Sequence, residues 1–243
     1  MQLKSLVLED PTLEKTLSKI RKYGCAILPN FFKEEVVRLM DRELTNYWAQ
    51  VKPGQQVIAE NGQFKEAGSY EPGIALRIQP TSYQNFTHTA TPFVHNPFLN
   101  TIIDSFYGSP NNKFMQIFAY HDTRLRDENW DDAINNSSAL HFDGWQSLKF
   151  ATYLTHTSQE NGMTRFIPGS HVEGKKLREA QSEPIFPDIR DFPESDYTET
   201  DAIYPAVGAG DLVIFDTDCW HGGGEILVEG RDRKCIICHS RQR

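Results

Sequence analysis

The sequence has no long apolar run, no cluster of basic residues and little cysteine. No stretch approaches the roughly 18 apolar residues of a membrane-spanning helix, and residues 1–6 lack the apolar centre of a signal peptide. The net charge of -8 and the absence of a Lys/Arg run argue against nucleic acid as a partner. We therefore expect a cytoplasmic protein, a monomer or homodimer, that acts on a small molecule and not on a membrane.

The four cysteines include one suggestive pair. Cys235 and Cys238 have the spacing of a zinc or redox pair. They lie in a strand-like run from residue 234 to 239, and positions three apart on a strand face opposite ways. We interpret them as buried, reduced thiols, with the zinc or redox pair as the alternative.

The length and the order of the patterns favour one catalytic domain over residues 1–243. A chain of 243 residues with 39% apolar content can bury one good core. Helical patterns come first and many short strand patterns follow. This order fits a mainly β fold with flanking helices, a double-stranded β-helix of the jelly-roll or cupin type. We expect helical support over about residues 1–110 and a metal-binding barrel core over about 111–243.

Hydrophobic periodicity places the individual elements. Helices are predicted over residues 10–22, 33–49 and 92–107, the first with Asp10 as its cap and Pro11 in its first turn. Strands are predicted near residues 24–29, 74–78, 114–120, 139–143, 148–155, 163–167, 203–206, 211–216 and 233–240. Residues 52–73, 122–138 and 172–202 lack periodicity and are predicted to be loops that concentrate substrate recognition, the first a candidate lid.

A His-x-Asp pair is the strongest chemical signal. In the alternating segment that contains His141 and Asp143, side chains two positions apart point to the same face of a strand. A third ligand has to come from a strand distant in sequence, and His221 follows the apolar run 210–215. Two imidazoles and one carboxylate are the ligand set of a non-heme iron(II) oxygenase.

Further motifs follow this pair in a fixed order. Asn161-Gly162 is a hairpin-turn signal, and the later segments are Thr164–His171 with Pro-Gly-Ser-His, Gly208–Asp211, Trp220–Gly224 and Arg233–His239. The ordered set resembles the phytanoyl-CoA dioxygenase family of iron(II)/2-oxoglutarate oxygenases. The resemblance covers roughly residues 138–241, and residues 23–32 resemble that family's N-terminal strand and turn.

The resemblance implies Fe(II), 2-oxoglutarate and O2 as cofactor and cosubstrates. His141, Asp143 and His221 would be the catalytic metal ligands, and Arg233 would bind the distal carboxylate of 2-oxoglutarate with its planar guanidinium. Arg231 is the alternative clamp. The family often has Ser or Thr two residues after the distal histidine, where this chain has Gly223, so that contact is lost or supplied elsewhere.

Four further residues are candidates for the pocket. The resemblance places Gln116 where it would contact the cosubstrate, with a polar strand residue as the alternative. Tyr153, on the strand that follows the first metal ligands, is a second candidate contact, with a packing role as the alternative. Arg77, alone among apolar neighbours, is a candidate for gripping a substrate carboxylate or phosphate, or a solvent-facing charge. Trp145 is a candidate wall of the substrate pocket, or a core aromatic. The histidine of Pro-Gly-Ser-His belongs to a turn motif and is left out of the metal ligands.

The carboxylate among the three ligands bears on the reaction type. Superfamily members that halogenate have Gly or Ala at that position, whereas this chain has Asp143. We therefore expect a hydroxylase of a small metabolite, such as an amino acid or a natural-product intermediate, with release of succinate and CO2. Desaturation or ring closure, an acyl substrate tethered to CoA or a carrier protein, and a non-catalytic metal-binding barrel with a regulatory role remain alternatives.

Overall fold

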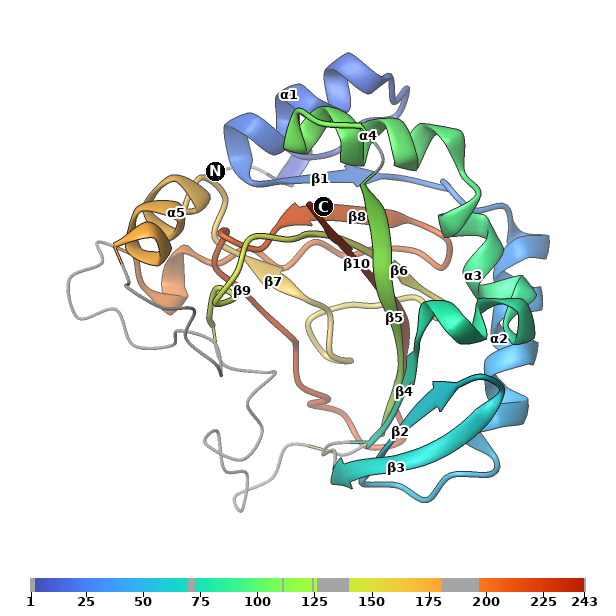
Figure 1. Cartoon of the computed structure of the whole chain (residues 1–243). Helices are drawn as coiled ribbons and strands as arrows, with labels where there is room; N and C mark the ends of the chain where they lie inside the picture. The colour runs from blue at the N-terminus through green and yellow to red at the C-terminus, as the bar shows by residue number, and fades with distance from the viewer. Residues whose placement is uncertain are drawn as a thin grey trace.

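A large sheet faces a small one at the centre of the molecule. The computed structural model describes residues 3–69, 73–110, 112–123, 125, 140–180 and 197–242. The large sheet has the strand order β1-β8-β6-β10-β5-β4-β2-β3, and the small one pairs β7 with β9 (Figure 1). The strands are β1 (Cys25–Leu28), β2 (Gln55–Glu60), β3 (Gln63–Ser69), β4 (Gly73–Ile78), β5 (Lys113–Asp122), β6 (Leu148–Tyr153), β7 (Arg165–Phe166), β8 (Leu212–Asp216), β9 (His221–Gly222) and β10 (Arg233–Arg241).

Helices cover the outer face of the large sheet. They are α1 (Leu13–Tyr23), α2 (Glu34–Trp48), α3 (Thr87–Val94) and α4 (Pro97–Tyr107). The helix α5 (His171–Glu179) lies instead beside the small sheet, where Leu177 packs against Ile167 and Trp220, and short 3-10 helices lie at Leu3–Ser5, Pro80–Asn85 and Glu199–Asp201. Figure 1 shows α1 and α4 above the sheet and α2 and α3 along its side. Leu17, Met40 and Ile102 from these helices pack with Phe150 and Ile214 of the sheet in one buried cluster. Each such side chain contributes roughly 1.5–3 kcal/mol by burial.

The inner face of the large sheet forms a second buried cluster. Tyr153, Phe215 and Cys235 lie in it together with Phe166 of the small sheet. Cys238 belongs instead to the cluster under the helices, because a separation of three reverses the face. All four cysteines are free and buried, so the interpretation of the pair as buried thiols is confirmed.

The small sheet is made of very short pieces. Besides β7 and β9, it has single bridges from His141 to His221 and from Phe166 to Ile203. The strands predicted near 139–143, 163–167 and 203–206 are thus shortened to one or two paired residues, because the Pro-Gly-Ser turn and the glycines after His221 end the pairing. The two facing sheets confirm the predicted double-stranded β-helix.

The prediction of a loop over residues 52–73 is wrong. Residues 55–60 and 63–69 pair as the antiparallel hairpin of β2 and β3, and β2 also pairs in parallel with β4. Asn61 and Gly62 have φ of 49° and 78°, the two left-handed residues of a type I′ turn. This edge hairpin is largely exposed, so its strands carry few of the apolar residues from which strands were predicted.

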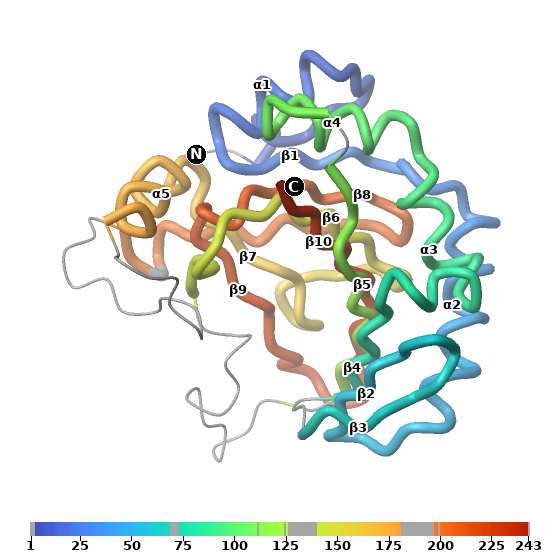
Figure 2. The backbone as a smooth tube through the Cα atoms, in the orientation of Figure 1, coloured from blue at the N-terminus to red at the C-terminus, as the bar shows by residue number. Residues whose placement is uncertain are grey.

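The turn signal at Asn161-Gly162 has a different outcome. The segment does turn, with the Asn161 and Met163 amides both donating to Ser158 O. β6 and β7, which flank it, do not pair with each other, because the chain crosses here from the large sheet to the small one (Figure 2). Asn161-Gly162 is therefore a crossover turn and not a hairpin turn.

Helix boundaries also differ from the predictions. The helix predicted over 92–107 is two helices, since Asn96 caps α4 through its side chain and Pro97 occupies the first helical position. The cap of α1 lies two residues later than predicted, because Thr12 Oγ1 accepts from the Lys15 amide and takes the capping role given to Asp10.

Two predicted loops fall largely outside the described residues. For the loop 122–138, residues 124 and 126–139 lie outside them. The prediction of a loop over residues 172–202 is partly wrong, because residues 171–179 form α5. Residues 181–196 lie outside the described residues. Within the described part of the chain, no helix is long and apolar enough to cross a bilayer.

Candidate active site

Backbone pairing in the small sheet brings the three candidate ligands together. The His141 amide donates to His221 O and the His221 amide donates to His141 O, both at 2.9 Å. The Asp143 amide donates to Thr217 O at 3.2 Å. The ligand atoms of His141, Asp143 and His221 lie within 4.8 Å of one another, and all three residues are buried. Residues 78 positions apart in sequence thus form one cluster.

Hydrogen bonds orient the donor atoms toward one another. His221 Nδ1 lies 2.8 Å from Cys219 O; a carbonyl only accepts, so Nδ1 carries the proton and the Nε2 lone pair is left for a metal. Asp143 Oδ1 lies 3.5 Å from His221 Nε2 and 3.8 Å from His141 Nε2. Two imidazole nitrogens and one carboxylate oxygen in this arrangement fit the facial ligand set of non-heme iron.

Lys149 on β6 is a functional residue that the sequence analysis missed. Its Nζ lies 2.8 Å from Asp143 Oδ2, 3.1 Å from Asp143 Oδ1 and 3.5 Å from His221 Nε2. The signal was a lone charge between Leu148 and Phe150 in an apolar strand, the same signal that identified Arg77. The ammonium group lies directly beside the ligand cluster.

This environment keeps Asp143 ionised. Burial alone would raise the pKa of the Asp143 carboxyl, but the charge of Lys149 and the imidazoles of His221 and His141 outweigh it and hold the pKa well below its usual range. A carboxylate that is ionised at every working pH binds a metal without first losing a proton.

Arg233 lies at the opposite end of β10 from the metal-ligand cluster and is buried. Its Nε donates to Asp122 Oδ2 at 2.6 Å, its Nη2 pairs with the same carboxylate, and its Nη1 donates to Gly162 O. Asp122, which the sequence analysis missed, is 1% exposed and lies opposite Arg233 in the β5–β10 register. The guanidinium is therefore held in a fixed orientation by one buried carboxylate.

Arg77 and Gln116 are brought together on the inner face. Arg77 Nε donates to Gln116 Oε1 at 2.7 Å, and the guanidinium lies 5.7 Å from the Phe118 ring. Gln116 pairs with His239 in register, and His239 pairs with Lys149, so a polar layer runs across the sheet to the ligand cluster. Burial lowers the pKa of His239 well below its ordinary value, and Lys149 lowers it further, so this ring is neutral.

Tyr153 and Trp145 have different surroundings. The Tyr153 hydroxyl donates to Thr164 Oγ1 at 2.7 Å and accepts from the Thr164 amide at 3.0 Å, which fixes this buried ring. Trp145 is 42% exposed and lines a cavity of about 50 Å³ together with Gln116 and His239. Trp145 therefore lies beside the polar layer, whereas the Tyr153 hydroxyl is hydrogen-bonded to Thr164.

The glycines that follow His221 are needed by the backbone. A Cβ at Gly224 would lie 2.2 Å from Met163 O, and Gly223 O accepts from Arg165 Nη1 at 2.6 Å. The close approach is therefore between Gly224 and the backbone of Gly162 and Met163.

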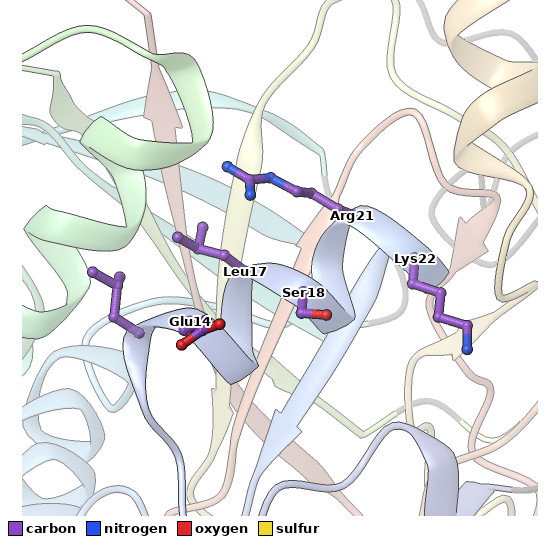
Figure 3. Close-up of a pocket in the computed structure, with 6 residues that line it drawn as sticks. Glu14, Leu17, Ser18, Arg21 and Lys22 are labelled. Carbon is purple, nitrogen blue, oxygen red and sulfur yellow. The ribbon is translucent and has the colours of Figure 1, made fainter.

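Two features lie away from this cluster. The histidine of Pro-Gly-Ser-His, His171, donates from Nε2 to Arg21 O at 3.0 Å. A hollow of about 640 Å³ follows one face of α1 and is lined by Leu13, Glu14, Leu17, Ser18, Arg21 and Lys22 (Figure 3). These lining residues include none of the candidate ligands, and the hollow is a surface feature of one helix.

Comparison with known proteins places this geometry in a family. The model of the phytanoyl-CoA dioxygenase (PhyH) family matches residues 20–235. One curated relative, "Dioxygenase cdmA" of Talaromyces verruculosus, is 29% identical over 85 residues; this match spans 35% of the chain and only 23% of that protein.

Solved structures share the fold. EvdO2 from Micromonospora carbonacea var. aurantiaca, complexed with 2-oxoglutarate, is 16% identical with a TM-score of 0.63, covering 97% of this chain and 93% of that one. The epimerase SnoN, in complex with Fe3+, alpha ketoglutarate and nogalamycin RO, is also 16% identical with a TM-score of 0.63, covering 95% and 83%. Because the family model spans most of the chain, the protein belongs to the phytanoyl-CoA dioxygenase family of 2-oxoglutarate-dependent non-heme iron dioxygenases.

Proposed function

We propose that this protein hydroxylates an unactivated carbon of a small metabolite, with His141, Asp143 and His221 as its Fe(II) ligands. The observation that carries the proposal is the buried cluster in which the three ligand atoms lie within 4.8 Å of one another. When bound, Fe(II) together with 2-oxoglutarate and O2 supplies the oxidising chemistry, and succinate and CO2 are the coproducts. The residues of the chain bind and orient the reactants and exclude water from the site.

The ligands are held for this role by their neighbours. The Cys219 carbonyl fixes the tautomer of His221, so Nε2 presents its lone pair to the metal. Lys149 Nζ is closest to Asp143 Oδ2, while Oδ1 is the oxygen nearest the two imidazoles. Lys149, which also donates to Oδ1 at 3.1 Å, therefore holds the Asp143 carboxylate in place beside the two imidazoles.

Arg233 is the proposed clamp for the distal carboxylate of 2-oxoglutarate. Asp122 and the Gly162 carbonyl orient it, and Cys235, two residues along the strand, lies in the inner-face cluster. Arg231, by contrast, is exposed. These observations support Arg233 over Arg231.

Hydroxylation is proposed over halogenation because of Asp143. A carboxylate at this position takes the coordination site that a halide would need. Asp143 is kept ionised by Lys149 and is buried among the imidazoles, which supports its role as a ligand.

Succinate formation tests the proposal. Purified protein with Fe(II), 2-oxoglutarate and O2 is screened against amino acids and natural-product intermediates, and hydroxylated products are sought by mass spectrometry with 18O2. We expect substrate-stimulated succinate carrying one oxygen from O2, lost in Asp143→Ala and kept in His171→Ala. Undiminished turnover in Asp143→Ala would remove the site assignment.

A further inference from the structure

Among the described residues, Arg77 is a cation of the polar layer that has no carboxylate partner. Arg77 faces the interior because Ile74, Leu76 and Ile78 on the same strand pack into the outer cluster under the helices. Its Nε donates to the neutral Gln116 amide at 2.7 Å. Among the residues that the structure describes, no carboxylate lies within 4.0 Å of its guanidinium.

Two neighbouring cations on the inner face of the large sheet have carboxylate partners. Lys149 is matched by Asp143, and Arg233 by Asp122, each through direct ion pairs. Fe(II) carries two positive charges and 2-oxoglutarate two negative ones, so their binding leaves the sum unchanged. The neighbouring His239 ring is neutral and adds no charge. Arg77 has no such partner among the residues that the structure describes, although its site is half-buried, and an unmatched charge removed from water is strongly unfavourable.

The guanidinium is also positioned for recognition. Gln116 Oε1 fixes its Nε edge and the Phe118 ring lies against its face, so a planar donor pair is oriented in advance. Gln116 and Trp145 line the same small cavity beside this layer. Arg77 can thus bind a carboxylate at little further cost in side-chain entropy.

We propose that the substrate of this enzyme carries a carboxylate, which Arg77 binds after Gln116 has oriented it. The inference rests on the proposed function and narrows its substrate class to carboxylic acids. Gln116 acts as a positioning residue in this arrangement, and its amide stays bonded to Arg77 when the substrate binds.

Matched acids and amides test the proposal without turnover. Benzoate and benzamide, and hexanoate and hexanamide, are titrated calorimetrically into the anaerobic protein loaded with Fe(II) and saturating 2-oxoglutarate. In the wild type, at least one acid is expected to bind roughly 10- to 100-fold more tightly than its amide, the effect of one charge-assisted bidentate contact. In Arg77→Met this preference is expected to fall below about threefold, with partial recovery in Arg77→Lys.

Arg231→Met, which removes an exposed arginine, is the matched control and keeps the preference. Amides that bind as tightly as acids, an absence of binding by every acid, or an undiminished preference in Arg77→Met would each overturn the proposal. Hexanoyl-CoA binding ten times more tightly than hexanoate would also overturn it, in favour of a tethered substrate. Because binding is measured, a failure here is distinct from a failure to form succinate.

Discussion

Replacing Arg233 with methionine changes two quantities at once, stability and cosubstrate binding. Asp122 is 1% exposed and forms its ion pair with Arg233, so Arg233→Met leaves a buried carboxylate without its cation. Such a loss costs about 3–5 kcal/mol of folding free energy. Loss of the clamp for 2-oxoglutarate costs about 2–3 kcal/mol of binding, which raises the KM roughly 30- to 150-fold.

The double variant Asp122→Asn/Arg233→Met separates the two effects. It removes both charges of the pair, so most of the lost stability is expected to return, as measured by urea unfolding. The KM for 2-oxoglutarate is expected to stay raised, since the cation is still missing. Arg231→Met is the control and changes each quantity only slightly, because that side chain is exposed.

The reasoning is refuted if the double variant regains wild-type KM along with its stability. Arg233 would then be a structural partner of Asp122 and not a ligand of the cosubstrate. A raised KM in Arg231→Met and an unchanged one in Arg233→Met would instead show that the clamp lies two residues earlier in the chain.

Three further predictions concern the loop before His221 and the reaction outcome. Burial raises the pKa of Asp216 to about 7, so its protonated form stabilises the fold fully below about pH 4, and this stabilisation is lost as the pH rises through 7. Between pH 5 and 8 the free energy of unfolding, measured in urea, should fall by about 2–3 kcal/mol more in the wild type than in Asp216→Asn. Equal decreases in the two proteins would contradict the assignment. Arg178 binds the fully buried Asp218 at 2.6 and 2.9 Å. Arg178→Met should therefore lower the free energy of unfolding by about 3–5 kcal/mol, and Arg178→Met/Asp218→Asn should restore most of it. A decrease below about 1 kcal/mol in Arg178→Met would contradict this prediction. In bromide-rich buffer the product should carry oxygen and no bromine, and a brominated product by mass spectrometry would mean that Asp143 is not a ligand.

The clustering of His141, Asp143 and His221 agrees with the sequence prediction, and their binding of a metal stays a prediction. Alternation placed His141 and Asp143 on one face of a strand, whereas the choice of His221 rested on the buried strand before it and on the resemblance to the family. Lys149 carried the same kind of signal and was missed, since one lysine in an apolar strand also fits a solvent-facing position. Its contact with Asp143 depends on pairing between strands that the sequence does not specify.

The two Asn-Gly turns show that a local turn signal does not determine which strands pair. Asn61-Gly62 and Asn161-Gly162 are the same dipeptide, yet the first closes β2 and β3 while the second joins two sheets. The difference lies in what flanks them: an edge ribbon pairs with itself, whereas β6 is already paired on both sides with β8 and β10. Tertiary pairing decided the outcome, and the dipeptide alone could not.

Anaerobic Fe(II) titration of the wild type, His141→Ala and His171→Ala tests the central claim most directly. His171 is the matched control, because its ring bonds to the Arg21 carbonyl and lies outside the ligand cluster. The wild type and His171→Ala are expected to bind about one Fe(II) per chain, and His141→Ala, with an unchanged circular dichroism spectrum, at least roughly 100-fold more weakly. Wild-type affinity in His141→Ala would contradict the account.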